Sequence, residues 1–456
     1  MKKVLALFLA VAMAFGAMAG CTQPNNDDVE NTKAPVSEPT ISSEEQPIVD
    51  PNKEYTINFW HGETDDSRIA GMQEVIDGFK MIYPNVTITQ TAVNNAEFFT
   101  KMVAALASGT APDIAATTPE RTMAYRNLGY GIALDDVVGE IDATEKYASE
   151  NPKSLYYFDE HYWAVPVWAI TIMLFYRADL FEANGLTPPT TWDELLNAAK
   201  TLTKDGAYGI GLPASSGQNC TDQVAWSFLS TNKADVFNDK GEIVFNSKET
   251  VETYEFLQEL AQFSPEDCTG WGWAETKLSF TSGSCAMNFM FGSSLADLAK
   301  TDFSDSVGAV SIPKPKNGTY GGNTHTEGLM IFSDDPAIQQ ICKDFILYFM
   351  SAEMYGKALS NMEPGLMLPI TETGMQSDDF FNQEINAKYA NIIKAELEQV
   401  KTGSLYGFKY PVRSAYAGEI GVSYLLGGTL ERVVSGTMSP ADAVAWGEEQ
   451  MIALCE

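Results

Sequence analysis

The sequence predicts an α/β protein built as two lobes, and three observations support this prediction. Strand-like and helix-like segments alternate from Tyr55 onward, an order typical of sheets covered by helices. About 400 residues follow the polar N-terminal region, which is more than one hydrophobic core usually accommodates. Hydrophobic residues make up 45% of the chain, enough to form sizeable cores.

The alternation begins with a strand-like stretch, YTINFW, at residues 55–60. Apolar residues then recur at helical spacing from Ile69 to Phe79, and NVTITQT reads as a second strand. A second helix is predicted through Phe98 and Leu106, and PDIAAT supplies a third strand. Ligands of such sheets bind beyond the carboxyl ends of the strands, so the loops after these strands are candidates for a binding site.

Two later helices are predicted from their N-terminal capping sequences. Thr191 is followed three residues later by Glu194, a capping box that predicts a helix through the apolar pattern that follows. Ser439 and Pro440 predict the start of a C-terminal helix, because proline is favoured at the first helical position. Between these helices, YGIGLP at residues 208–213 is expected to form a strand.

The N-terminus predicts export. Residues 1–20 carry two lysines, an apolar run and small residues at the end, the layout of a secretory signal peptide. Met18-Ala19-Gly20-Cys21 resembles the lipobox of bacterial lipoproteins, so Cys21 is expected to carry lipid and to anchor the protein at the outer face of the cell membrane. Residues 21–54 are rich in proline, serine and acidic residues and are expected to be a disordered tether.

Composition and motifs argue against several classes of function. The net charge of −32 lacks the basic footprint that nucleic acids require. No motif of nucleophilic, metal or nucleotide chemistry is visible in the sequence, and a cofactor is not expected. Carboxylate pairs such as Glu63 and Asp65 would suffice for glycoside hydrolysis, but in an acidic chain such pairs usually belong to solvated loops.

Aromatic residues are concentrated in the stretch YYFDEHYWAVPVWAITIMLFY at residues 156–176. Flat rings pack against the apolar faces of sugars, while neighbouring polar groups bond the hydroxyls. Most of these rings are expected to be core residues. Trp168 is the preferred candidate for ligand contact, because it follows Pro166 where a segment between lobes is expected to cross.

These segments in this order resemble the carbohydrate-binding extracellular solute-binding proteins (family 1) of ABC importers. The resemblance runs from Tyr55 to the end through INFWHG, LASGTAPDI, YWAVPVW, FTSGSCAMNFMFG, VSIPKPKNG and SPADAVAWGEEQM. It implies a type II periplasmic-binding-protein fold that closes on a sugar in a cleft, without catalysis. The implied N-terminal lobe comprises residues 55–165 and 311–363, and the C-terminal lobe comprises residues 166–310 and 364–456. Hinge crossings are implied near residues 165–166, 311–312 and 364–369.

The resemblance also implies partners and ligand contacts. The partners are a carbohydrate and the permease subunits of an importer, with the binding protein acting as a monomer. The implied ligand contacts are Trp60, His61, Glu63, Asn94, Thr118, Glu120, Trp168, Ser215, Gln218, Ser294, His325 and Tyr424. Many relatives place a stacking tryptophan where this chain has Ser293 and Ser294, so the stack is expected from Trp168, Trp271 or Trp273, or the ligand differs from a maltodextrin.

Three alternatives remain open from the sequence. The ligand of a binding protein could be a polyamine, a peptide or iron, although Tyr156 and Tyr157 do not form an obvious iron-ligand pair. A surface glycosidase would need two carboxyl groups facing each other across the cleft. A structural adhesin would have no closing cleft.

Overall fold

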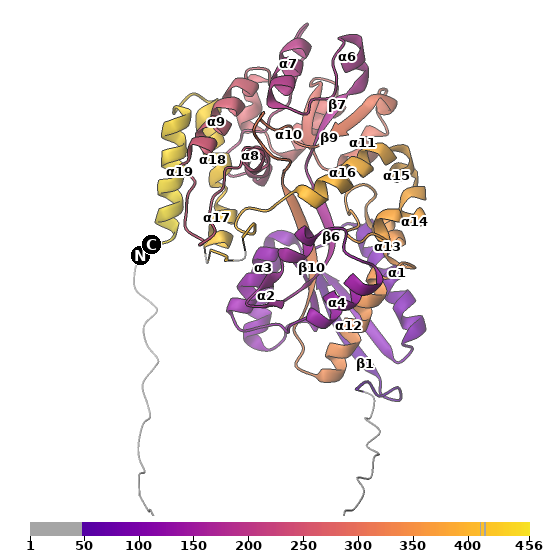
Figure 1. Cartoon of the computed structure of the whole chain (residues 1–456). Coiled ribbons are helices and arrows are strands. Elements are labelled where there is room, and N and C mark those ends of the chain that lie inside the picture. The colour runs from indigo at the N-terminus through magenta and orange to yellow at the C-terminus, as the bar shows by residue number, and fades with distance from the viewer. Residues whose placement is uncertain (1–47, 411, 415) are drawn as a thin grey trace, which may run out of the picture. The chain divides into compact units, whose positions relative to one another are not determined.

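The computed structural model describes residues 48–410, 412–414 and 416–456. The predicted signal peptide, the lipidation predicted at Cys21 and most of the predicted tether lie outside these residues. The described chain is an α/β protein with two main sheets, one in each of two lobes (Figure 1). We call the part with the five-stranded sheet the first lobe and the part with the three-stranded sheet the second lobe.

The sheet of the first lobe has the order β2-β1-β3-β10-β6. Strand β1 is parallel to β2 and β3, whereas β10 runs antiparallel to β3 and β6. The three predicted strands at residues 55–60, 85–91 and 112–117 are confirmed in this sheet. Its strands are β1 (Tyr55–His61), β2 (Val86–Ala92), β3 (Ile114–Thr117), β6 (Val165–Thr171) and β10 (Thr324–Ile331).

Helices cover both faces of this sheet, because successive strand residues point to opposite faces. Ile114 and Ala116 of β3 belong to one core cluster, together with apolar side chains of α1, α4, α12 and α13. Ala115 between them belongs to the other cluster, with side chains of α2 and α3. The helices of this part are α1 (Asp66–Ile82), α2 (Asn95–Ser108), α3 (Pro119–Asn127), α4 (Asp135–Thr144), α5 (Glu150–Ser154), α12 (Pro336–Met350) and α13 (Tyr355–Met362).

The sheet of the second lobe has the order β8-β7-β9, with both outer strands antiparallel to β7. Its strands are β7 (Met173–Arg177), β8 (Met287–Met290) and β9 (Val307–Val310). The helices along this part of the chain are α6 (Ala178–Ala183), α7 (Trp192–Leu202), α8 (Asn219–Thr231), α9 (Lys248–Ala261), α10 (Trp273–Thr281) and α11 (Leu295–Leu298). The remaining helices are α14 (Asp378–Asn382), α15 (Glu384–Lys388), α16 (Ala390–Thr402), α17 (Ala417–Ser423), α18 (Leu425–Val434) and α19 (Pro440–Leu454).

Both predicted helix starts are confirmed. The Thr191 side chain accepts from the backbone N–H of Glu194, and the Glu194 carboxylate accepts from the Thr191 N–H at 3.1 Å. Ser439 caps α19 by accepting from the N–H of Asp442. The strand predicted at residues 208–213 is wrong, since only two isolated bridges form there. A side chain at Gly209 would collide with the carbonyl of Ala199, so this segment runs too close to α7 for a regular ladder.

A short hairpin precedes the aromatic run. Its strands, β4 (Tyr157–Phe158) and β5 (His161–Tyr162), pair antiparallel through a two-residue turn. The turn residues Asp159 and Glu160 both have positive φ values, of 50° and 67°, as a type I′ hairpin turn requires. The hairpin therefore carries Tyr157, Phe158 and Tyr162 of the aromatic run, while Trp168, Phe175 and Tyr176 lie on β6 and β7.

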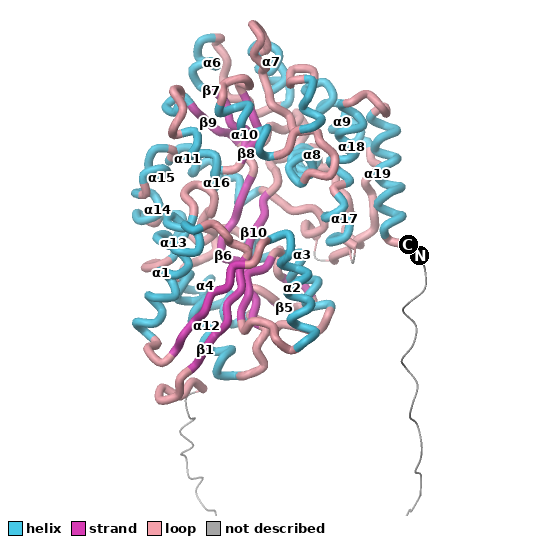
Figure 2. The backbone as a smooth tube through the Cα atoms, turned by 180° about the vertical axis from the view of Figure 1, so that it is seen from behind, coloured by secondary structure: helices cyan, strands magenta, loops and turns pink. Residues whose placement is uncertain are grey.

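The chain passes between the two sheets at three places. Strand β6 pairs with β10 as far as Thr171, so the first passage lies between Thr171 and Met173, several residues after the crossing expected at residues 165–166. The second passage joins β9 to β10 across residues 311–323, and the third follows α13. Strands β6 and β10 run side by side toward the second lobe in both views (Figures 1 and 2). The domain boundaries drawn from the sequence stay a prediction.

Trp168 is a core residue, which contradicts its predicted role in stacking on a ligand. Its side chain is only 1% exposed, and its ring packs edge-on against Phe349 of α12 at 6.2 Å between centroids. Trp168 lies in the centre of β6, where it pairs with Glu327 of β10, and its ring belongs to a core cluster with side chains of α12 and α13. Ser294 is also buried, at 4% exposure, in the turn that precedes α11.

Gly292 is a point of close contact between the third passage and the second lobe. A Cβ atom at Gly292 would lie 1.9 Å from the carbonyl oxygen of Gly365 and 2.9 Å from Oε1 of Glu396. The Gly365 carbonyl belongs to backbone and cannot rotate away as a side chain would. Residue 292 therefore has to be glycine for this passage to pack as it does.

We expect Gly292→Ala to lower the free energy of unfolding by about 2–3 kcal/mol, since the added methyl group forces backbone apart in a packed region. Urea denaturation would measure the change. Gly139→Ala is the matched control, because nothing lies within 4 Å of a Cβ there and Gly139 lies inside α4. This control should stabilise the protein by roughly 0.5–1 kcal/mol. Equal effects of the two substitutions would contradict the packing described for Gly292.

Candidate functional site

Polar side chains gather at one edge of the five-stranded sheet. The carboxyl ends of β1 and β3 meet there, and because β10 is antiparallel, its first residues reach the same edge. Gly328 of β10 pairs with Thr117 at the end of β3, so His325 and Glu327 extend beyond that strand. We call this group of loop and strand residues the sheet edge; it comprises Glu63, Asn95, Thr118, Glu120, Arg121, His325 and Glu327.

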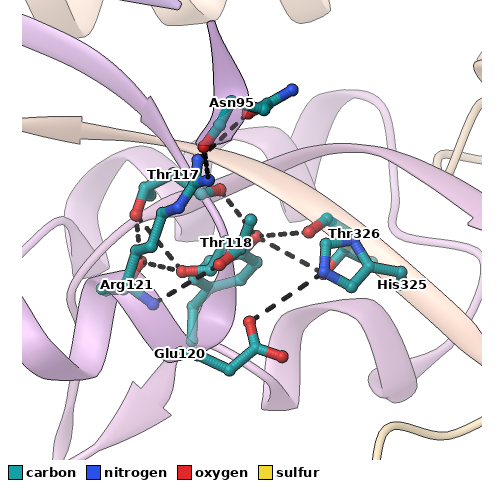
Figure 3. A network of polar contacts seen from close by, with 9 residues as sticks. Asn95, Thr117, Thr118, Glu120, Arg121, His325 and Thr326 are labelled. Carbon is teal, nitrogen blue, oxygen red and sulfur yellow. Dashed lines mark hydrogen bonds and ion pairs between the residues drawn. The ribbon is translucent and has the colours of Figure 1, made fainter. Parts of the chain in front are cut away.

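Arg121 and Glu120 of α3 organise the centre of the sheet edge (Figure 3). The Arg121 guanidinium donates to the side-chain oxygen of Asn95 at 3.2 Å and to its backbone carbonyl at 3.0 Å. Thr118 caps α3 by accepting from the Arg121 N–H at 3.4 Å. The Glu120 carboxylate lies 3.9 Å from Nε2 of His325. Burial lowers the pKa of His325, against the attraction of Glu120, so the imidazole is mostly neutral at pH 7.

Tyr156 links the two strands that lead to the sheet edge. Its hydroxyl lies 3.2 Å from the carbonyl oxygen of Thr117 and 2.9 Å from that of Thr326, so it ties β3 to β10. The side chain is fully buried, and burial raises its pKa well above the usual value. Tyr156 therefore stays protonated and acts as a donor to the two strands that carry Thr118 and His325.

His61 lies at the end of β1 but is buried, with 1% exposure, so a direct ligand contact is not available to it in this structure. Its Nε2 lies 2.9 Å from the side-chain oxygen of Gln90, and burial lowers the pKa of His61. The Gln90 amide in turn donates to Gln73 at 2.7 Å, and the Gln73 amide donates to Asp77 at 2.8 Å. Because an ionised carboxylate only accepts, this series of bonds places the His61 proton on Nε2.

Glu63, directly after β1, belongs to an ion-pair cluster. Arg68 donates to the Glu63 carboxylate at 2.5 Å and also contacts the carboxylate of Glu363, at the end of α13. Only 7% of the Glu63 side chain and about a fifth of the other two are exposed. Burial opposes the charged form of Arg68, but the attraction of both carboxylates outweighs burial and raises its pKa. Arg68 therefore joins the loop after β1 to the third passage between the sheets.

Glu327 is a site residue that the sequence did not single out. It is partly buried, it stands on the same face of β10 as His325, and the pairing of β10 with β6 shifts register directly after it. Burial and the nearby Glu63 carboxylate raise the pKa of Glu327 to about 8, although Arg121 and Arg68 act in the opposite direction. The available signal was the alternation in THTE, where two buried threonines flank the outward-facing histidine.

The second lobe contributes aromatic and amide groups. Trp273 opens α10, and its indole N–H donates to the side-chain oxygen of Asn219 at 3.1 Å. Its ring lies 4.6 Å from that of Phe291, measured between centroids. Gln218, which precedes α8, lies against Gly272. Phe291 adjoins Gly292, which packs against Gly365 of the third passage.

A second group of residues of the second lobe lies next to α3. Tyr406 is buried and donates to the Asp222 carboxylate at 3.3 Å, and its hydroxyl lies close enough to Glu120 and Tyr424 for their charges to raise its pKa further. Helix α17 contacts α3. Tyr424, between α17 and α18, has φ +52°, a left-handed conformation that is rare for a bulky residue and is often found at functional sites.

The predicted contacts therefore divide into groups. Glu63, Thr118, Glu120 and His325 lie together at the sheet edge, and Gln218 and Tyr424 lie in the facing groups of the second lobe. Trp60 is half-buried and packs against the core, and Ser215 lies in the same loop as Gln218. Asn94 is exposed at the start of α2. Arg121, Glu327 and Arg68 were missed. Arg121 and Arg68 lie close to Glu120 and Glu63 in the sequence, whereas Glu327 reaches the site only through the pairing of β10 with β3.

Other kinds of site receive no support within the described ranges. Two cavities, of about 620 and 580 Å³, lie elsewhere: one lies beside Tyr83 and Asp344, the other beside Met375 and Lys394. Residues 48–410, 412–414 and 416–456 contain no cluster of metal ligands. All five described cysteines are unpaired. No described helix has both the length and the apolarity to cross a bilayer.

The model of the bacterial extracellular solute-binding protein family matches residues 65–355. The chain belongs to this family. This solute-binding protein is 24% identical over 335 residues to the Escherichia coli protein YcjN, which is named as an ABC transporter periplasmic-binding protein; the match covers 70% of the chain and 73% of YcjN.

Solved structures show the same fold. The cyclic alpha-maltosyl-1,6-maltose binding protein of Arthrobacter globiformis superposes with a TM-score of 0.72 and 21% identity, over 88% of this chain and 99% of the other. A solute-binding protein of Agrobacterium radiobacter in complex with ribitol gives 0.70 and 21%, over 89% and 100%. The expected type II fold is confirmed for this solute-binding protein, with a mixed sheet in the first lobe; the sheet of the second lobe is antiparallel rather than mixed.

Proposed function

We propose that this solute-binding protein captures a sugar or polyol between its lobes and delivers it, unaltered, to the permease of an ABC importer. It acts as a monomer, held at the outer face of the cell membrane by lipid on Cys21. The observation that carries the proposal is that the two lobes offer complementary groups. The sheet edge of the first lobe has carboxylate, amide and hydroxyl groups, and the second lobe has the aromatic pair Trp273 and Phe291. Hydroxyls of a sugar bond the first group, and its apolar face packs on the second.

Relatives with this fold support the sugar or polyol class, since maltosyl and ribitol ligands are named for two of them. Ligand contact with both lobes stabilises the closed form by its differential affinity for that form. Micromolar affinity corresponds to about −8 kcal/mol, which one or two stacked rings and several hydrogen bonds can supply. A panel of monosaccharides, oligosaccharides and polyols, screened by thermal shift, would find the ligand, because a hundredfold excess over Kd stabilises by about 2.7 kcal/mol.

Trp273→Ala should weaken binding of the ligand found in this way by about tenfold or more, because it removes the larger ring of the half-buried aromatic pair. Isothermal titration calorimetry would measure the change. Trp446→Ala serves as the matched control, since Trp446 packs on Arg432 between α18 and α19 and has no part in the proposed site. Unchanged affinity in Trp273→Ala would remove this ring from the site. Recovery of a hydrolysed glycoside after incubation would favour the alternative of a surface glycosidase.

A further inference from the structure

The cations at the sheet edge are already occupied. Arg68 is shared between the carboxylates of Glu63 and Glu363, and Asp65 lies 3.5 Å from its Nε. Arg121 is held by two oxygen atoms of Asn95. His325 is mostly neutral at pH 7, because burial lowers its pKa. The edge therefore has little positive charge to offer an anionic ligand such as a phosphate, which recruits free arginine or lysine side chains.

Glu327 is the group at this edge that lacks a partner. None of the described residues forms a hydrogen bond or ion pair with its carboxyl group. The charged or titratable groups around it come from every neighbouring element: Glu63 after β1, Arg68 on α1, Arg121 on α3 and Tyr156 before β4. Of these, both arginines are committed elsewhere and Tyr156 donates to backbone carbonyls.

A carboxyl group left unpaired inside a polar network is costly unless something else completes the network. Glu327 is also set apart from its neighbours by position, since the β10 register shifts directly after it and it stands on the same face of β10 as His325. The missing element is a donor with positive charge, which no described side chain supplies.

We propose that the ligand of this site is an amino sugar or amino polyol, whose ammonium group lies against the carboxylate of Glu327. The inference rests on the proposed function, because it assigns a ligand class to the same site. An ammonium supplies the missing charge and up to three donors, which Glu327 and the nearby carboxylate of Glu63 can accept. A hydroxyl at the same place supplies one donor and no charge.

Binding of an ammonium also changes the protonation of Glu327. The pKa of about 8 means that the acid is mostly protonated at pH 7 in the empty protein. A cation at contact distance favours the ionised form, so the proton leaves for solvent as the ligand binds. Close to one proton per bound ligand should therefore be released at pH 7, and none in a protein that carries glutamine at this position.

The test is a panel of matched pairs in isothermal titration calorimetry at pH 7. Glucose, galactose and mannose are each compared with their 2-amino-2-deoxy forms, glucose also with its 3-amino and 6-amino forms, sorbitol with 1-amino-1-deoxysorbitol, and diacetylchitobiose with chitobiose. We expect at least one amine to bind about tenfold or more tightly than its neutral twin. The same titrations in two buffers of different ionisation enthalpy measure the released proton, because the observed binding enthalpy then differs between the buffers.

Glu327→Gln is the decisive variant, and Glu140→Gln, on the exposed face of α4, is its matched control. Glu327→Gln should lose both the preference for the amine and the proton release, while Glu140→Gln keeps both. A neutral twin that binds equally well or better overturns the inference and leaves the proposed function standing. A preference that survives in Glu327→Gln overturns the role of Glu327. If no saccharide or polyol of either kind binds, the proposed function itself is wrong.

Discussion

Trp168→Ala should lower the free energy of unfolding by about 3–5 kcal/mol, the largest effect that we expect from a single side chain in this protein. The indole is 1% exposed in the centre of β6 and packs edge-on against Phe349, so its removal leaves a cavity that the sheet and α12 cannot fill. Guanidinium chloride denaturation of the wild-type and variant proteins would measure the difference. The variant that keeps its fold should bind ligand with an affinity close to that of the wild type.

Tyr320→Ala is the control for this experiment, because Tyr320 is 58% exposed. It should change stability by no more than about 0.5 kcal/mol. A Trp168→Ala protein as stable as Tyr320→Ala, yet impaired in binding, would restore the ligand contact expected from the sequence and contradict the burial described above.

Arg68→Met should lower the free energy of unfolding by about 2–4 kcal/mol at pH 7. The substitution leaves two mostly buried carboxylates, Glu63 and Glu363, without their shared cation, and unpaired buried charges are strongly destabilising. The expected value lies below that for a fully buried pair, because about a fifth of the Arg68 and Glu363 side chains stays exposed. Urea denaturation at pH 7 and pH 5 would show a smaller loss at the lower pH, where Glu363, whose pKa burial raises, protonates more readily.

Lys248→Met provides the comparison, since Lys248 forms an exposed ion pair with Glu252 at 3.2 Å. Breaking such a pair should cost at most about 1 kcal/mol. Arg68→Lys, which retains the charge but loses the planar fork, should recover part of the lost stability. An Arg68→Met protein that unfolds with the same midpoint as Lys248→Met would show that the cluster contributes nothing to folding.

Much of the fold could be predicted, because it depends on local patterns. The first three strands and both capped helices follow from apolar periodicity and from side chains that bond their own helix start, and the structure reproduces them. The first passage between sheets could not be placed, since nothing local marks how far β6 stays paired with β10. The strand expected at residues 208–213 failed for a tertiary reason, the close approach of Gly209 to α7.

The rule that ligands bind beyond strand ends predicts only part of the site. Glu63, Thr118 and Glu120 come after β1 and β3, and the rule that ligands bind beyond strand ends identifies them. Glu327 and His325 lie at the beginning of an antiparallel strand, and they reach the same edge only through the pairing of β10 with β3. The ligand contact predicted for Trp168 is wrong because an aromatic residue near a crossing has the same sequence pattern whether it faces a ligand or the core.

The series of bonds from Asp77 to His61 gives one surface atom an influence over a buried ring. Each amide in the series can point in either of two directions, and the terminal carboxylate selects one of them for all. The placement of a proton beneath the first strand is thus decided three hydrogen bonds away, on the outer side of a helix. Asp77→Asn would remove the group that only accepts, so the amides of Gln73 and Gln90 could both flip. His61 could then carry its proton on the other ring nitrogen without any movement of the backbone.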